Sequence, residues 1–220
     1  MKRKIELCMT LLLLLGAIVA SKKLSELVTS GEVKQKETVI IVDPGHGGED
    51  PGKVGVNDIL EKDLNLQVSQ KLISLLEKKG ITVLTTREDD NVPNAKMEDL
   101  QKRVKFINET NPTLTICVHQ NSYTDPTIKG AQVFYYAHSD DAKAAATSVQ
   151  EELRLLDPTN KREIKANDTY YMLKYTQVST IIVECGFLTN PEEAAKLTQE
   201  DYQQQIAQAI CDGVIKWLDK

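Results

Sequence analysis

Short runs of apolar and β-branched residues recur along the chain from residue 38 onward. Several of these runs are apolar at every position, as expected of strands that are covered on both faces of an α/β sheet. The predicted strands are Val39–Val42, Ile81–Thr85, Leu114–Val118, Ala131–Tyr136 and Thr180–Val183.

Apolar residues at helical spacing lie between the predicted strands. The first stripe runs from Leu64 to Leu76 and is followed by Lys78-Lys79-Gly80, where basic residues before a glycine favour a helix C-terminus. Further helices are expected from Met97 to Ile107, over about 140–156 and over about 199–218. Strands that alternate with helices indicate a single α/β domain, with a mainly parallel, twisted sheet flanked by helices on both faces.

The first 37 residues differ from the rest of the chain. Residues 1–20 combine a basic start with an apolar run from Leu7 to Ala20, which is shorter than the roughly 20 residues of a full membrane span. We expect a signal peptide or an N-terminal membrane anchor, and Ile18 fits a cleavage site poorly enough to keep both open. Residues 21–37 are polar and predict a tether, which leaves 38–220 as one domain, exported in either case.

The net charge and the positions of the cysteines argue against a nucleic-acid-binding protein and against a disulfide-rich one. The net charge is −5, and no basic stripe is present, which argues against nucleic acid as a partner. Contact with a membrane is expected only through the N-terminal segment. Cys117, Cys185 and Cys211 lie inside apolar runs, which favours buried free thiols over a disulfide framework.

Candidate chemistry gathers at the ends of the predicted strands. Only three histidines occur in 220 residues, and two of them, His46 in the turn DPGHGG and His119, follow predicted strands. Glu61 begins the first helix, and Glu184 ends the last strand. In α/β sheets ligands bind beyond the carboxyl ends of the strands. Two imidazoles and one carboxylate are the usual protein ligands of catalytic zinc, and a second carboxylate can act as general base or acid.

Each of these residues also has a purely structural explanation. Glycine-rich turns such as the one around His46 are common, and Glu61 suits the positive end of a helix. His119 could be a partly buried histidine without function. Glu184 is the hardest to explain in this way, because a carboxylate that ends a buried strand costs free energy unless it is paired or functional. Asp43 could orient His46 as a hydrogen-bond acceptor.

A larger set of motifs resembles the zinc-dependent N-acetylmuramoyl-L-alanine amidases. The resemblance runs from about Thr38 to Trp217. It implies zinc on His46, Glu61 and His119, with Glu184 as the catalytic carboxylate. The substrate would be the amide between the lactyl group of muramic acid and L-alanine in peptidoglycan. The matching residues are DPGHGG (43–48), Glu61-Lys62-Asp63, Thr86-Arg87 with Asp89, Arg103, His119 with Asn121, Gly130, and VECGFLTN (183–190).

One N-terminal apolar segment followed by one catalytic domain is the arrangement most similar to that of the spore-cortex amidases of endospore-forming bacteria (the CwlD type). That similarity implies a role in cortex maturation, muramic-δ-lactam formation and germination. The expected location is the forespore intermembrane space, with a possible activating or targeting protein partner.

The mechanism implies further contacts with the substrate. Asn121 or the backbone amides of Gly47 and Gly48 could stabilise an oxyanion. Arg87 could meet the acidic stem peptide, although a structural pair is the simpler expectation for Arg87 and Arg103. Gln120 replaces the alanine that is often found beside His119 in this family.

Two other functions stay open on the residues alone. The same ligand set could belong to another exported zinc hydrolase, such as a carboxypeptidase or a deacetylase. The chain could also be a peptidoglycan-binding protein with a weakened site.

Overall fold

A computed structural model describes residues 21–22, 38–93 and 95–219 of the chain. The expected signal peptide or anchor, and all but two residues of the expected tether, lie outside this part. Among the helices it does contain, none has both the length and the apolar character needed to cross a bilayer.

The domain from residue 38 onward is built on one six-stranded sheet with the order β2-β1-β3-β6-β4-β5. All neighbouring strands are parallel except β4 and β6, which are antiparallel. The predicted α/β class and mainly parallel sheet are therefore confirmed. The strands are β1 (Val39–Pro44), β2 (Thr82–Thr85), β3 (Leu114–Asn121), β4 (Gln132–Tyr136), β5 (Lys165–Asn167) and β6 (Thr180–Phe187).

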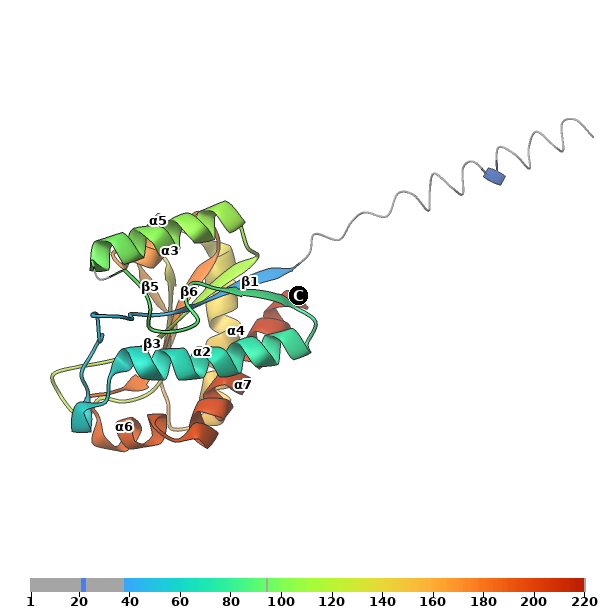
Figure 1. Cartoon of the computed structure of the whole chain (residues 1–220). Helices are drawn as coiled ribbons and strands as arrows, with labels where there is room; N and C mark the ends of the chain where they lie inside the picture. The colour runs from blue at the N-terminus through green and yellow to red at the C-terminus, as the bar shows by residue number, and fades with distance from the viewer. Residues whose placement is uncertain (1–20, 23–37, 94, 220) are drawn as a thin grey trace, which may run out of the picture. The chain divides into compact units, whose positions relative to one another are not determined.

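Helices cover both faces of this sheet, with α3 and α5 on one side and α2, α4 and α7 on the other (Figure 1). Alternate residues of β1 enter the two cores, since Ile41 packs with the α3 and α5 side, whereas Ile40 and Val42 pack with the α2, α4 and α7 side. The helices are α2 (Glu61–Lys78), α3 (Lys96–Thr110), α4 (Asp140–Leu156), α5 (Tyr171–Tyr175), α6 (Pro191–Leu197) and α7 (Glu200–Leu218), with a short 3₁₀ turn η1 (Val56–Asp58).

The structure adds short elements and lengthens the predicted strands β1, β3 and β6. The elements β5, α5, α6 and η1 have three to seven residues each, too few to produce a clear hydrophobic period. The helix α6 did carry a local signal, because Asn190 caps it and Pro191 opens it. Strands β3 and β6 continue past Val118 and Val183, so His119 and Glu184 lie inside their strands rather than after them.

Candidate active site

The loop after β1 folds back so that His46 faces the end of the sheet. His46 itself has a positive φ of 62°, which is uncommon for a residue with a side chain. Glycines allow the loop to approach the neighbouring side chains, because a Cβ on Gly45 would lie 2.1 Å from the His119 ring. A Cβ on Gly52 would lie 2.6 Å from Glu61 Oε2. The DPGHGG turn is thus shaped around the residues it brings together.

A buried ion pair holds this loop from beneath. The Arg103 guanidinium, 4% exposed, donates to Asp43 Oδ1 at 2.7 Å and to the carbonyls of Pro44 and His46, also at 2.7 Å. Asp43 therefore does not orient the His46 ring, as the sequence had suggested, but joins α3 to the end of β1. Although burial raises the pKa of Asp43, the charge of Arg103 is among the effects that leave it below its ordinary value.

Removing this arginine should destabilise the protein strongly. Arg103→Met leaves the Asp43 carboxylate buried without its partner, and breaking a buried pair in this way costs about 3–5 kcal/mol. We expect the free energy of unfolding, measured by urea titration, to fall by that amount. Lys102→Met is the matched control, because it breaks an exposed pair with Glu98 on the same helix and should cost less than about 1 kcal/mol. Equal losses in both variants would contradict the assigned role of Arg103.

Three side chains converge on one point beyond the sheet. Candidate ligand atoms of His46, Glu61 and His119 all lie within 4.8 Å of one another. His119 Nδ1 is 2.9 Å and His46 Nε2 is 3.3 Å from Glu61 Oε1. The two rings meet edge to face with centroids 5.0 Å apart. The two histidines and the carboxylate predicted from the sequence are thus placed together as one candidate metal site.

Electrostatics couple Glu61 and His119. Burial opposes charge on both groups, but their contact overcomes it, so the pKa of Glu61 lies well below and that of His119 above its ordinary value. Glu61 Oε2 also accepts a hydrogen bond from the Lys53 amide at 2.8 Å, and Oε1 accepts one from the Gln120 amide at 3.2 Å. The carboxylate is therefore held ionised and fixed in orientation.

Side chains that the sequence did not single out hold these groups in place. His46 Nδ1 lies 2.9 Å from Asp50 Oδ2, which directs the other ring nitrogen toward Glu61. Asn65, fully buried on α2, donates to the Gly45 carbonyl at 3.0 Å and to Glu61 Oε1 at 3.3 Å. Gln120 in turn donates from its side chain to Asn65 Oδ1 at 3.3 Å. Asp50 could have been suspected from its position four residues after His46, but Asn65 carries no local signal.

Glu184 lies directly beside the cluster. It pairs in register with His119 across the parallel strands β3 and β6. It is only 8% exposed, and Oε2 has no hydrogen-bond partner among the described residues. Burial raises its pKa to about 7, with the charge of His119 opposing this and that of Glu61 adding to it. A carboxyl group whose pKa is near 7 can accept a proton and return it at neutral pH.

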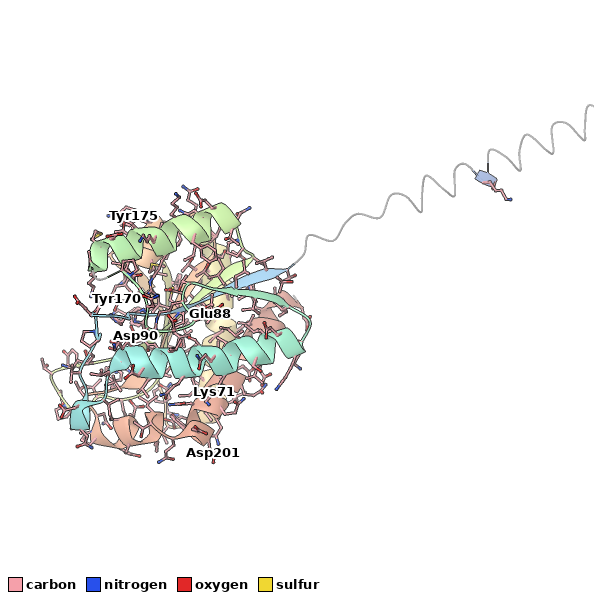
Figure 2. The ribbon with its side chains drawn as sticks, in the orientation of Figure 1. Lys71, Glu88, Asp90, Tyr170, Tyr175 and Asp201 are labelled. Carbon is pink, nitrogen blue, oxygen red and sulfur yellow. The ribbon has the colours of Figure 1, made fainter. Side chains whose placement is uncertain are left out.

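The cluster opens into a cavity of about 470 Å³. Its walls come from β3, β6, the start of α3 and the segment that begins α5. Tyr170 contributes an aromatic wall and packs against Phe134 with ring centroids 5.4 Å apart. In the view of Figure 2, Tyr170 lies between α3 and the start of α2. The site is therefore a cleft that a substrate larger than a single residue can enter.

Comparison with known proteins identifies the family of this chain. The model of the N-acetylmuramoyl-L-alanine amidase family matches residues 40–216. The chain belongs to this family.

Two relatives support the assignment. The germination-specific N-acetylmuramoyl-L-alanine amidase of Bacillus subtilis (strain 168) is 36% identical over 190 residues, covering 82% of this chain and 79% of the relative. The CwlD amidase of Clostridioides difficile, solved in complex with the GerS lipoprotein, is 37% identical with a TM-score of 0.80. That match covers 83% of this chain and 99% of the CwlD chain.

A third match comes from a different group of bacteria. The amidase AmiC2 of Nostoc punctiforme is 31% identical with a TM-score of 0.75, over 83% of this chain and 98% of that one. The expected resemblance to CwlD-type amidases is confirmed, and the protein is an N-acetylmuramoyl-L-alanine amidase whose substrate is peptidoglycan.

Three of the suggested substrate contacts in this amidase are already engaged within the fold. The amide of Gly47 donates to the Asp50 carbonyl at 3.1 Å, and that of Gly48 donates to Asp90 Oδ1 at 2.7 Å. Arg87 is buried behind the loop, where it donates to the carbonyls of Pro44, Gly45, Lys62 and Asp89. None of the three lines the cavity. The loop uses these groups to hold its own shape, which agrees with the structural role that was the simpler expectation for Arg87; a contact of any of the three with substrate stays a prediction.

Asn121 faces the cavity, whereas Cys117 and the third histidine of the sequence, His138, do not line it. Asn121 lines the cavity at the end of β3, so a contact between Asn121 and substrate stays a prediction. His138 packs against Tyr136 with ring centroids 5.3 Å apart and is not among the residues of the cavity wall. Cys117 is a buried free thiol whose pKa is raised by burial, as expected for a core residue.

Proposed function

We propose that His46, Glu61 and His119 hold a zinc ion, and that Glu184 is the catalytic carboxylate. The reaction is hydrolysis of the amide between the lactyl group of N-acetylmuramic acid and L-alanine of the stem peptide. The observation that carries this proposal is a His-Glu-His cluster within 4.8 Å that lies in register with a buried carboxylate of raised pKa.

The donor set suits the proposed metal. Two imidazoles and one carboxylate, with space toward a cavity, correspond to an open catalytic zinc site. The contacts of His46 with Asp50, and of Glu61 with Asn65 and two backbone amides, match the outer hydrogen bonds that orient metal ligands. When bound, zinc would polarise the substrate carbonyl and favour ionisation of the attacking water.

The protein's own groups then account for proton transfer. Glu184, with a pKa of about 7, is suited to take a proton from the attacking water. It can deliver that proton to the amine of L-alanine as the amide bond breaks. Its place beside His119 and its burial exclude bulk water from this exchange. Tyr170 and Asn121 line the same cavity and contribute to holding the muramoyl and peptide parts of the substrate.

Substitution of Asp50 tests the support of the proposed metal site. Asp50→Asn removes the carboxylate that accepts from His46, and loss of such an outer partner lowers metal affinity by about 10- to 100-fold. We expect the zinc Kd, from competition with a chelating dye, to rise by that factor. Glu49→Gln is the control, because Glu49 is exposed in the same loop. An unchanged Kd in Asp50→Asn would remove Asp50 from the metal site.

One experiment tests the proposed function as a whole. The full chain, purified with its metal content measured, is incubated with purified peptidoglycan, and the products are analysed by mass spectrometry. We expect stoichiometric zinc, free lactyl-muramic acid and peptides that begin with L-alanine. Release of acetate or of a C-terminal residue would instead indicate a deacetylase or a carboxypeptidase. Cleavage unaffected by removal of zinc would contradict the proposed metal centre.

We further propose that the amidase is exported and acts in spore-cortex maturation. Residues 1–20 would serve as the signal peptide or membrane anchor, 21–37 as a tether and 38–220 as the catalytic domain. The relatives named above include a germination-specific amidase and an amidase in complex with a lipoprotein, which supports a cortex role and a protein partner. Deletion of the gene in its host should abolish muramic-δ-lactam in cortex muropeptides; normal lactam content would contradict the cortex role.

A further inference from the structure

One cation stands in the wall of the catalytic cavity. Lys96 is the single lysine or arginine among the described residues that line it; the carboxylates Glu61 and Glu184 line the same space. Its side chain is 64% exposed, so the ammonium group can move toward a bound ligand. The cavity therefore offers one mobile positive charge to whatever enters.

The contacts of Lys96 leave most of its donors available. Its Nζ lies 3.0 Å from Asp50 Oδ2, the oxygen that also lies 2.9 Å from His46 Nδ1. An ammonium group has three donors, and this ion pair uses one of them. A pair this exposed contributes little to stability, so the bond to Asp50 does not by itself explain a lysine here.

Helix stability does not explain this lysine either. Lys96 is the first residue of α3, where the helix dipole disfavours positive charge and favours carboxylates. Glu98 and Asp99 in the same first turn follow the usual preference. A cation at the first position is thus a local cost that a function in the cavity would offset.

The charge balance of the cavity indicates which kind of ligand Lys96 would bind. With a zinc ion and an ionised Glu184, the carboxylates of Asp50, Glu61 and Glu184 face two charges of the metal and one of Lys96. The imidazoles must be neutral to bind metal. The sum is close to zero with Lys96 and negative without it, and a negative cavity repels an anionic ligand.

We infer that Lys96 binds a carboxylate of the stem peptide and thereby makes the amidase prefer stem peptides whose second residue carries a free carboxylate over those with the amide. This inference rests on the amidase activity and on the location of its centre in this cavity. It assigns Lys96 to substrate selection, in addition to its contact with Asp50.

Matched acid and amide ligands test the inference. The full-length protein is given N-acetylmuramoyl-L-alanyl-D-glutamate or its D-isoglutamine counterpart, each with the γ-carboxyl blocked as the methylamide so that the two differ only at the α-carboxyl, and KM and kcat are measured. We expect Lys96→Met to raise KM about tenfold for the acid and to leave KM for the amide unchanged. Lys96→Arg should restore the preference. Lys105→Met is the control, because Lys105 lies on the same helix in an exposed pair with Glu109.

Binding of the free dipeptides separates this inference from the proposed function. The Kd values of the γ-methylamides of L-alanyl-D-glutamate and L-alanyl-D-isoglutamine need no turnover, and Lys96→Met should weaken binding of only the first by about tenfold. Equal changes for acid and amide would overturn the inference and leave Lys96 as a support of Asp50 alone. If the wild-type protein cleaves neither muramoyl peptide, the proposed function is contradicted, while the two Kd values still decide the role of Lys96.

Discussion

Replacing Glu184 by glutamine is expected to lower kcat by about 10²- to 10⁴-fold, the usual contribution of a general base or acid. Glutamine has nearly the shape of glutamate but cannot accept and return a proton at neutral pH. Glu184 Oε2 has no hydrogen-bond partner among the described residues, so the substitution breaks no contact that holds the fold. The loss should therefore appear in kcat on muropeptides, with an unchanged melting temperature.

Metal content separates this effect from damage to the site. Glu184 is not part of the His46, Glu61 and His119 cluster, so Glu184→Gln should bind zinc as tightly as the wild-type protein does. Glu192→Gln is the matched control, because Glu192 is exposed on α6 and pairs only with surface lysines. Hydrolysis by Glu184→Gln at a rate near that of the control would exclude Glu184 from the mechanism.

Much of the fold could be predicted because its main elements have strong periods. The stripe from Leu64 to Leu76 lies on α2, and the apolar runs of β1 and β3 are buried on both faces of the sheet. The antiparallel direction of β4 could not be predicted from the sequence, because the hydrophobic period of a strand does not depend on the direction of its neighbour. The three residues of β5 are fixed by pairing with β4 rather than by local preference.

Some residues of the candidate site could likewise be predicted from the sequence, and others could not. His46, His119 and Glu184 could be found because they lie in or just after the carboxyl-terminal parts of buried strands, which meet at one edge of the sheet. Asn65 and Lys96 could not be assigned, because their roles depend on contacts made only after the loop and helices have packed. Asp50 had a local signal only in its spacing from His46.

The other candidates for substrate contact show the same dependence on packing. Glycine amides and a conspicuous arginine suggest anion binding in a sequence, but the DPGHGG loop needs internal donors to keep its unusual backbone. Gly47, Gly48 and Arg87 supply them. Sequence alone does not show whether a polar group is used within the fold or left for a ligand.

Replacing Glu61 by glutamine should have the other large effect, loss of metal together with activity. The amide keeps the size of the side chain but removes the negative charge that lies 2.9 Å from His119 Nδ1 and 3.3 Å from His46 Nε2. In the wild-type protein, zinc at 1,000 times its Kd should stabilise the fold by about 4 kcal/mol. We expect Glu61→Gln to abolish most of the zinc-induced rise in melting temperature and to reduce hydrolysis to background.

Comparison with Glu184→Gln gives this result its meaning. Both substitutions remove one carboxylate from the same cavity, but Glu61 lies in the ligand cluster and Glu184 lies beside it. The expected pattern is therefore loss of zinc and turnover in one variant, and loss of turnover alone in the other. If Glu61→Gln kept the full zinc-induced stabilisation, the metal would have to be held elsewhere, because a site of His46 and His119 alone would lack its charged ligand.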